Sequence, residues 1–301
     1  MNIERILENP VALRALTGLN RDEFDRLVVA LDRAFQYATR RNWRGEPRQR
    51  AKGAGPKSCL PTTSHKLFFI LFYYKVYPIQ HAMAALFGVA QSGVCEWVHY
   101  LTALAQKALG RELVLPQRKP RGLAEVLREH PHLVTMVDGT ERPTRRPEDD
   151  DEQRRRYSGK KKRHTVKNLV ASAQRRVLFL GRTTPGSQHD KTLFDQARLR
   201  CPTGTKLVSD SGFEGCILPG AEWLRPFKKR RGQKRDPFFR RWNRQLARLR
   251  VEVEHVLAGV KRCRIVLDPL RNWRAGFADA VMEIACGLHN LRELYRRPAT
   301  A

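Results

Sequence analysis

Two aspartates follow short apolar segments and could share one site. Asp138 comes directly after the β-prone run at 132–137, and Asp210 comes directly after a second such run at 206–209. Ligands collect at the carboxyl ends of strands in α/β sheets, so these side chains converge if the two strands are neighbours in one sheet. An aspartate in this position is also common in an ordinary turn, where its oxygens accept bonds from backbone N–H groups. The residue types alone do not choose between these interpretations.

A predicted long helix at about 240–262 offers a third carboxylate, from Glu252 or Glu254. Helical periodicity gathers its apolar residues on one face: Leu246, Leu249, Val253, Val256, Leu257 and Val260. The two glutamates lie on opposite flanks of that face at about equal angles, so periodicity does not choose between them. Arg250, Glu254 and Lys261 share one flank within about 40°, as expected of a face that binds metal and phosphate. An ordinary i,i+4 Arg–Glu pair on a solvated flank explains the same spacing.

Three carboxylates brought together would form a site for a hard divalent cation. Mg²⁺ and Mn²⁺ prefer oxygen ligands, with water completing the shell. Two such ions about 3.5–4 Å apart can activate water or a 3′-hydroxyl on one side of a phosphodiester and stabilise the leaving oxygen on the other. The predicted chemistry is therefore phosphodiester cleavage or transfer with Mg²⁺ or Mn²⁺ as the cofactor.

The charge of the whole chain indicates a polyanionic partner. Its 301 residues include 58 Lys and Arg against 30 Asp and Glu, so the formal net charge is +28 and the isoelectric point is about 10.7. A polyanion that neutralises this surplus also releases its own condensed counterions. Nucleic acid is the first hypothesis. An anionic membrane surface is the second, but the chain has no convincing basic amphipathic helix with bulky aromatics opposite. Generic solubility does not require so extreme an isoelectric point.

No feature of the sequence indicates a membrane or secreted protein. The longest apolar run, at 67–74, is far shorter than the roughly 18–20 residues that cross a bilayer, and the N-terminal residues lack a signal-peptide core. The six cysteines form no CxxC pair and no zinc-like spacing with histidine. We therefore expect a cytoplasmic, nucleoid-associated protein with no membrane partner.

The N-terminal part reads as helical. A helix at 16–35 is expected, with Asn20 as its N-cap, and it is followed by a basic linker at 40–57. Residues 62–109 are again helical, and 79–100 has the pattern of a helix-turn-helix, whose second helix would begin near Gln91. In such a unit Gln91, Ser92 and Glu96 would contact bases or phosphates, although an ordinary helical hairpin explains the pattern equally well.

From residue 131 onward, strands and helices alternate. The predicted elements are strands at 132–137, 165–173 and 177–183, a helix at 191–199, a strand at 206–209, the long helix and a closing amphipathic helix at about 275–295. This order predicts an α/β layer domain.

At this point a resemblance to a known family becomes specific. Six segments, in order along the chain, resemble the DDE transposases of the insertion-sequence-five family, which is related to the eukaryotic Harbinger group. These segments are 137–141 (VDGTE), 157–162 (YSGKKK), 164–167 (HTVK), 185–190 (PGSQHD), 209–213 (SDSGF) and 250–261 (Arg250, Glu254 and Lys261), and the segment GLHNL around Asn290 is similar to the closing helix of the family. The resemblance covers roughly residues 60–296.

The resemblance implies a fold, a catalytic triad and a domain plan. It implies an RNase H-like mixed sheet flanked by helices, preceded by an all-α helix-turn-helix-like region. The catalytic and metal-binding residues would be Asp138, Asp210 and Glu254. The predicted parts are an N-terminal helical segment with its linker at 1–56, a DNA-binding region at 57–115 and a catalytic domain at 130–296 with a basic insertion near 214–240. The family signature has a tyrosine where this chain has Ala247, so the DNA contact that this tyrosine would make is not expected here.

Further residues are expected to hold DNA or to support the carboxylates. Basic loops at 142–146, 154–163 and 228–241 would bind phosphates. The DNA-binding residues predicted are Lys160, Lys161, Lys162, Arg163, Lys228, Lys229, Arg230, Arg231, Arg250 and Lys261. Asp190, at the start of a helix, and His189 are expected to support the site rather than to bind metal. The acidic run at 148–152 is expected to lie on a solvated loop.

The leading functional hypothesis is a transposase. It would bind the ends of its insertion sequence, cleave DNA and join the 3′-OH strand to target DNA by two-metal chemistry, acting as a homo-oligomer on DNA. The alternative is a non-catalytic DNA-binding protein derived from a transposase. That hypothesis predicts the loss of at least one acid of the triad, and all three are present. A basic scaffolding protein would explain neither the ordered acids nor a metal dependence.

Overall fold

The computed structural model describes residues 1–40, 58–227 and 236–296. The predicted linker and the basic residues Lys228, Lys229, Arg230 and Arg231 lie outside these ranges. The chain divides into two compact units. The first comprises Met1–Leu115 with Arg262–Ile265 and Ala280–Ala301, and the second comprises Pro116–Lys261 with Val266–Asp279. The closing helix therefore belongs largely to the N-terminal helical unit.

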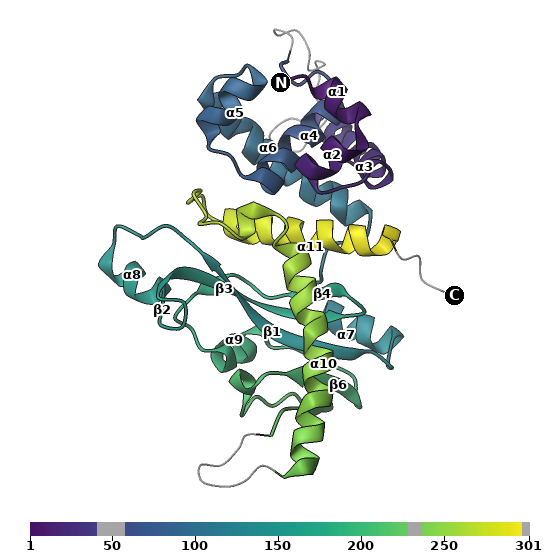
Figure 1. Ribbon diagram of the computed structural model, residues 1–301, viewed down its shortest axis with the longest axis vertical. Helices are drawn as coiled ribbons and strands as arrows, with labels where there is room; N and C mark the ends of the chain where they lie inside the picture. Colours follow the sequence, from purple (N-terminus) through teal and green to yellow (C-terminus); the bar gives the residue numbers. More distant parts are fainter. Residues whose placement is uncertain (41–57, 228–235, 297–301) are drawn as a thin grey trace. The chain divides into compact units, whose positions relative to one another are not determined.

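The first unit is built of helices only in its described part (Figure 1). They are α1 (Ile3–Glu8), α2 (Pro10–Thr17), α3 (Arg21–Thr39), α4 (Thr63–Val76), α5 (Gln80–Phe87), α6 (Gln91–Arg111) and most of α11 (Phe277–Arg296). The residues of α4 from Lys66 to Tyr74 are all buried, because α2, α3 and α6 pack around this helix. As predicted, Asn20 caps α3, where it forms a capping box with Glu23.

Helices α5 and α6 follow the predicted helix–turn–helix spacing. Gly88 ends α5 with φ +66°, a left-handed conformation that favours glycine, and α6 begins at Gln91. Met83 and Val94 are fully buried between the helices and their neighbours. Gln91, Ser92 and Glu96 are exposed. Contact of these residues with DNA remains a prediction.

The second unit contains one mixed sheet of seven strands (Figure 1). The strands are β1 (Val134–Pro143), β2 (Tyr157–Ser158), β3 (Arg163–Ala173), β4 (Arg176–Leu180), β5 (Thr184–Pro185), β6 (Thr205–Ser209) and β7 (Ala221–Leu224). Their order is β2-β3-β1-β6-β7, and β4 and β5 also pair with β3. Strands β1, β3 and β4 are antiparallel neighbours, whereas β6 runs parallel to β1 and β7 runs parallel to β6.

Helices cover both faces of this sheet. On one face α7 (Pro120–Glu129) and α9 (Asp190–Ala197) insert Leu127 and Phe194 into a core with Val137 and Leu169. Side chains of a strand alternate between the two faces, so Met136 and its alternate neighbour Asp138 lie on the opposite face. The long helix α10 (Pro237–Val260) crosses the sheet (Figure 1) and contacts β1, β3 and β6.

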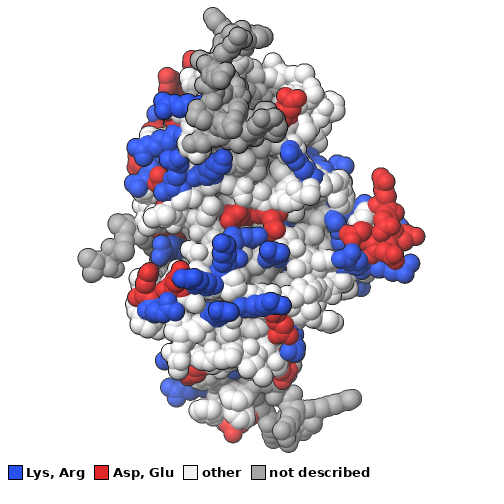
Figure 2. Space-filling model, turned by 180° about the vertical axis from the view of Figure 1, so that it is seen from behind, with Lys and Arg blue, Asp and Glu red and all other residues white. Residues whose placement is uncertain are grey.

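Two differences from the sequence prediction concern the charged residues. The first strand does not end before Asp138 but continues to Pro143, because β3 pairs with it along that length. The acidic run predicted as a loop is the start of a helix, α8 (Asp150–Arg156), which Asp149 caps. Its acids lie in the first turn and its arginines in the last, a distribution that the helix dipole favours. These charges form the red and blue cluster at the right edge of Figure 2. Short turns complete the described chain, η1 (Ser211–Phe213) and η2 (Arg264–Val266).

Within the described ranges, no helix has both the length and the apolar character needed to span a bilayer.

Candidate active site

The pairing of β1 with β6 places Asp138 and Asp210 next to each other. The two strands are parallel, and Val137 is in register with Ser209. The residues that follow these partners are the two aspartates, one on each of two adjacent strands. The condition set by the sequence, that the two strands be neighbours, is therefore met. The pairing of β1 with β6 ends at Val137 and Ser209, whereas β1 remains paired with β3 as far as Pro143. The two aspartates therefore lie where β1 and β6 separate.

The carboxyl of Asp138 is held in an environment that disfavours its charge. Burial first, and then the negative charges of Asp210 and Asp190, raise its pKa from 3.8 to about 6. Two groups act in the opposite direction: the backbone N–H of Gly139 donates to Asp138 Oδ1 at 2.8 Å, and Arg250 contributes positive charge. A carboxylate that gains from added positive charge is suited to a cation site.

Asp210 also accepts a hydrogen bond from the backbone of the turn that follows it, one of the two roles expected from its position after a strand. It caps η1, where its Oδ1 accepts a hydrogen bond from Gly212 N at 2.8 Å. Asp190 lies close by, because a Cβ at Gly212 would be 2.8 Å from Asp190 Oδ2 and 3.0 Å from Asp210 Oδ1. The three aspartates thus come from β1, from the end of β6 and from the first turn of α9.

Lys167 holds Asp190 in place from inside the sheet. This buried side chain, on β3, forms ion pairs with Asp190 at 3.1 Å and with Glu141 at 3.4 Å, and it donates to the Gln188 carbonyl at 3.0 Å. Such contacts agree with the supporting role expected for Asp190. His189 is exposed and precedes α9 without a side-chain capping bond. One sequence feature could have indicated this cluster: Lys167 stands within a run of apolar residues that was predicted as a strand. A lysine that is buried in a strand is almost always paired with acidic side chains.

The structure distinguishes the two glutamates of α10. The Glu252 side chain accepts a hydrogen bond from Arg175 N at 2.7 Å, so it fixes the β3–β4 turn. Glu254 is exposed, on the flank that carries Arg250 and Lys261. Both of these cations lie within electrostatic range of Asp138: the charge of Arg250 lowers the pKa of Asp138, and the charge of Asp138 raises the pKa of Lys261. The flank predicted from helical periodicity is therefore the one directed toward Asp138.

Lys261 lies within electrostatic range of two carboxylates and a further cation. Burial lowers the pKa of Lys261, and the charge of Lys161 lowers it further, whereas Asp138 and Glu141 raise it. Lys161 belongs to the exposed turn Lys160–Arg163, which connects β2 to β3 and includes the first residue of β3. Lys161 is exposed and its charge reaches Lys261, which in turn lies within electrostatic range of Asp138. Phosphate binding by these residues stays a prediction.

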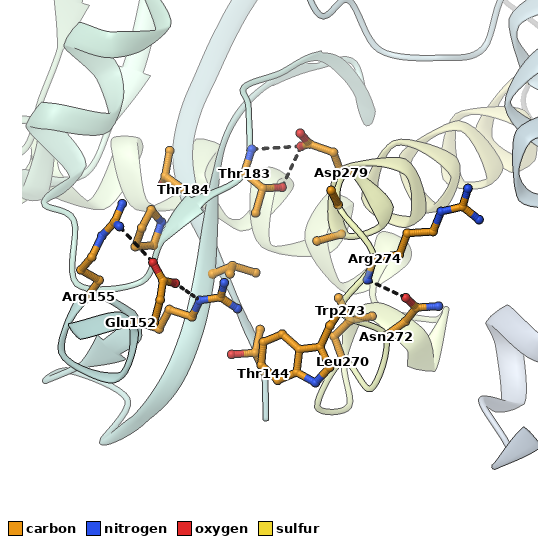
Figure 3. Close-up of a pocket in the computed structure, with 16 residues that line it drawn as sticks. Thr144, Glu152, Arg155, Thr183, Thr184, Leu270, Asn272, Trp273, Arg274 and Asp279 are labelled. Atoms are coloured by element: carbon orange, nitrogen blue, oxygen red, sulfur yellow. Dashed lines mark hydrogen bonds and ion pairs between the residues drawn. The ribbon is translucent and has the colours of Figure 1, made fainter. Parts of the chain in front are cut away.

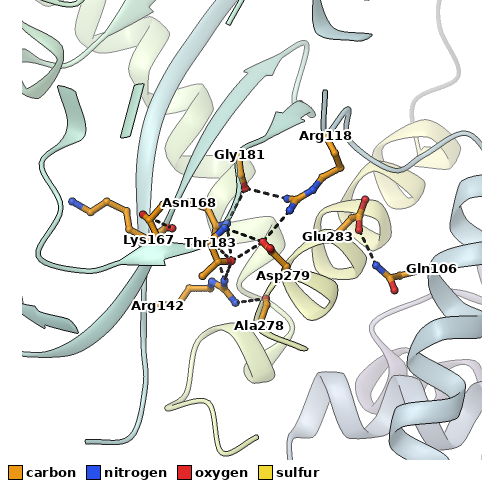
Figure 4. A network of polar contacts seen from close by, with 11 residues as sticks. Gln106, Arg118, Arg142, Lys167, Asn168, Gly181, Thr183, Ala278, Asp279 and Glu283 are labelled. Carbon is orange, nitrogen blue, oxygen red and sulfur yellow. Dashed lines mark hydrogen bonds and ion pairs between the residues drawn. The ribbon is translucent and has the colours of Figure 1, made fainter. Parts of the chain in front are cut away.

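Arg142 was predicted to lie on a phosphate-binding loop, but the structure places it inside the sheet. It is buried on the extended part of β1 and donates to Asn168 Oδ1 at 2.8 Å and to the Ala278 carbonyl at 3.1 Å. Asp279 accepts bonds from the hydroxyl and the backbone N–H of Thr183 (Figure 3). It also pairs with Arg118 at 2.9 Å, and Figure 4 shows these groups as one polar network. This network stabilises the second unit and leaves Arg142 engaged within it.

The donor chemistry of the site suits a divalent metal ion, although the carboxylates are not drawn together around one point. Asp138, Asp210, Asp190 and Glu254 offer only oxygen donors, the kind that Mg²⁺ and Mn²⁺ prefer. In the described part of the chain, no three or more acidic, histidine or cysteine side chains are close enough together to hold a metal ion. Asp138 is partly buried, and burial together with the charges of Asp210 and Asp190 raises its pKa to about 6. The fit rests on this observation, because a bound cation would offset the negative charge of that carboxylate.

Comparison with known proteins assigns the family. The model of the DDE superfamily endonucleases matches residues 137–290, a span that begins at β1 and contains Asp138, Asp210 and Glu254. The chain belongs to the DDE superfamily of endonucleases. This confirms the resemblance seen in the sequence motifs.

Two relatives of this DDE endonuclease align over nearly its whole length. One, from Microchaete diplosiphon, is named a probable transposase for insertion sequence element IS702; it is 27% identical over 272 residues, which are 89% of this chain and 93% of the relative. The other, from Streptomyces albus G, is named a putative transposase for insertion sequence element IS112. It is 26% identical over 284 residues, 94% of this chain and 95% of the relative. No solved structure matches the chain.

Proposed function

We propose that this DDE endonuclease is a transposase that binds the ends of its insertion sequence, cleaves DNA and joins the 3′-OH strand to target DNA. The observation that carries the proposal is the register of β1 and β6, which sets Asp138 beside Asp210 within the family match. The names of the two relatives support it.

We further propose that the sheet of the second unit is RNase H-like. The support is its arrangement of strands: β4, β3 and β1 are antiparallel neighbours, and β6 and β7 then add in parallel. In this arrangement a central strand carries the first aspartate and its parallel neighbour leads to the second, so one open edge of the sheet receives both carboxylates.

Asp138, Asp210 and Glu254 would hold the divalent ions. When bound, Mg²⁺ or Mn²⁺ supplies Lewis-acid activation of the attacking oxygen and stabilisation of the leaving oxygen. Lys167 and Gly139 N orient the carboxylates around the site through Asp190 and Asp138, respectively. Glu254 stands one helical turn after Arg250, whose charge already reaches Asp138.

The cations near the carboxylates would bind the DNA backbone. Lys161 and its neighbours on the exposed turn Lys160–Arg163, together with Arg250 and Lys261, form a positively charged rim around the acids. Phosphate contacts of this kind position DNA without reading its sequence. Recognition of the element ends would fall to the exposed first turn of α6, at Gln91, Ser92 and Glu96.

A strand-transfer assay tests this function. The purified full chain is incubated with DNA that carries the ends of its element and a target plasmid, with Mg²⁺ or with EDTA. We expect joined products only with Mg²⁺, and none from Asp138→Ala, Asp210→Ala or Glu254→Ala. If these variants join DNA as well as the parent does, the assignment is wrong. Binding of the ends without any cleavage by the parent would favour the non-catalytic DNA-binding alternative.

A further inference from the structure

A cavity of about 350 Å³ lies in the second unit, apart from the carboxylates (Figure 3). Its walls come from α8, from the strands around Thr144 and Thr183, and from the connection at 270–279 that precedes and begins α11. Its volume lies within the range of about 300–1,000 Å³ that is usual for small-ligand pockets. No step of the proposed strand transfer uses these residues.

An aromatic ring stands at this cavity with its position fixed. Trp273 is 50% exposed, and the guanidinium of Arg156 lies over its ring, 5.1 Å from the ring centroid. Arg156 is itself held by an ion pair with Glu152 at 2.9 Å. In Figure 3 the indole lies across the cavity from Thr183 and Asp279. The ring is therefore oriented by a cation on one face while about half of its surface remains accessible.

Polar groups in the same cavity favour a nucleotide as its ligand. The Thr144 hydroxyl is buried and has no hydrogen-bond partner among the described residues, so it can donate to or accept from a ligand. Arg155, which is two-thirds exposed at 66%, and Arg274 line the opening. The charge of Glu152 is offset by its two ion pairs, with Arg155 and Arg156. An aromatic face, an unpartnered hydroxyl and cations at the rim match the base, its polar edge and the adjoining phosphate, respectively.

We propose that this cavity binds a single unpaired nucleotide of the DNA substrate, with its base stacked on Trp273. The proposal rests on the proposed function, because it names one part of the DNA that this transposase would hold. A base inside a duplex must unpair and unstack before it can enter such a cavity, and this costs free energy. The cost is smaller for a base at a frayed or cleaved end, because that base is unpaired and stacks on one side only. The cavity would therefore hold a DNA end open after cleavage or before joining.

Fluorescence measurements on the full chain test the proposal. The probes are two duplexes of the same sequence, one blunt and one with a one-nucleotide overhang of 2-aminopurine. Affinity is measured by anisotropy, and stacking is measured by quenching of 2-aminopurine. The variants are Trp273→Ala and Trp273→Phe. The control is Leu267→Ala, because Leu267 also lies between α10 and α11, six residues before Trp273, with a similar exposure of 49% but outside the cavity.

We expect the parent and Leu267→Ala to bind the overhang duplex at least about fivefold more tightly than the blunt one. This factor corresponds to the smallest gain in affinity that one base stacked on an aromatic ring usually contributes. Trp273→Ala should lose both the preference and the quenching while it binds the blunt duplex normally, and Trp273→Phe should keep part of both. A parent that binds both duplexes equally, or a Trp273→Ala variant that keeps the preference, overturns the cavity proposal and leaves the proposed function intact. A parent that binds neither duplex overturns both.

Discussion

The carboxylate of Asp190 occupies the space that a side chain at residue 139 would need. A Cβ at Gly139 would lie 2.7 Å from Asp190 Oδ1. The backbone of Gly139 also donates to Asp138, so one glycine allows two acidic side chains to approach the same point of β1. The sequence showed Asp-Gly only as the end of a strand. The structural reason for the glycine is the close approach of a helix from elsewhere in the chain.

Gly139→Ala should therefore displace Asp190 and destabilise the fold. Overpacking of this kind costs about 1–3 kcal/mol in the free energy of unfolding, which denaturant titration measures. Gly159→Ala is the matched control, because no described atom lies within 4 Å of a Cβ at that position. In the background of Asp190→Ala the cost of Gly139→Ala should shrink, since the clashing carboxylate is gone. An equal cost in both backgrounds would show that Asp190 is not the obstacle.

Asp138→Asn should stabilise the metal-free protein at pH 7. The folded pKa of about 6 exceeds the usual value of 3.8, so the folded state binds a proton more tightly than the unfolded state does. The free energy of unfolding therefore falls as pH rises from about 4 to 6 and stays lowered above that range. The amide removes this charge, and the gain at pH 7 should be about 1–3 kcal/mol. Thermal unfolding in EDTA at pH 4, 5, 6 and 7 checks it, and a variant without any gain at pH 7 would contradict the burial of Asp138.

Asp279→Asn should have the opposite effect on stability. Burial alone would raise the pKa of Asp279, but hydrogen bonds from Thr183 and the ion pair with Arg118 outweigh it and hold the pKa below its usual value. The stabilisation is therefore present above about pH 4 and is lost as pH falls through the lowered pKa. At pH 7 the variant should lose about 1–3 kcal/mol in the free energy of unfolding.

Asp195→Asn provides the comparison for Asp279. Its ion pair with Lys191 spans one turn of α9, and both side chains are 52% exposed. Removal of an exposed pair of this kind should cost no more than about 0.5 kcal/mol. Denaturant titration at pH 7 and pH 3 should show a difference between the two variants at pH 7 that narrows at pH 3. A difference that does not depend on pH would mean that poorer packing, rather than the missing charge, destabilises Asp279→Asn.

The exposed turn Lys160–Arg163 should contribute to DNA affinity through charge alone. For Lys161→Gln with Lys162→Gln, the slope of log affinity against log salt should become shallower by about one for each phosphate that the turn no longer binds. The decrease in affinity should be the same for unrelated DNA sequences. Arg121→Gln serves as the control, because Arg121 is exposed but already paired with Glu125 on α7. A salt slope that is unchanged in the double variant would remove this turn from the DNA interface.

Sequence reasoning located the two aspartates, but it could not position the glutamate. Asp138 and Asp210 follow apolar runs that are short enough to be strands, and the pairing of those strands needed only one further assumption. Glu252 and Glu254 are equivalent by helical periodicity. The hydrogen bond from Arg175 N separates them, and this contact joins residues 77 positions apart. No local pattern carries such information.

Three other features depend on tertiary contacts or on charge rather than on apolar periodicity. Arg142 resembles its exposed neighbours in sequence, yet it is buried because β1 continues along β3 and brings it to Asn168. Helix α8 contains no buried residue, so it lacks the apolar pattern by which helices are recognised. Its cap at Asp149 and its ion pairs to Glu152 stabilise it instead. Trp273 gave no signal in the sequence, because the cavity beside it is assembled from three distant segments.

The claim that Asp138, Asp210 and Glu254 form one divalent-metal site is tested most directly by a titration of Mn²⁺ into the full chain, with bound ion measured by electron paramagnetic resonance. The parent should bind Mn²⁺, and Asp138→Asn, Asp210→Asn and Glu254→Gln should each weaken binding at least about tenfold. Glu252→Gln, two residues along the same helix, should bind as the parent does. Binding that is weakened by Glu252→Gln and not by Glu254→Gln, or by none of the four substitutions, would contradict the site.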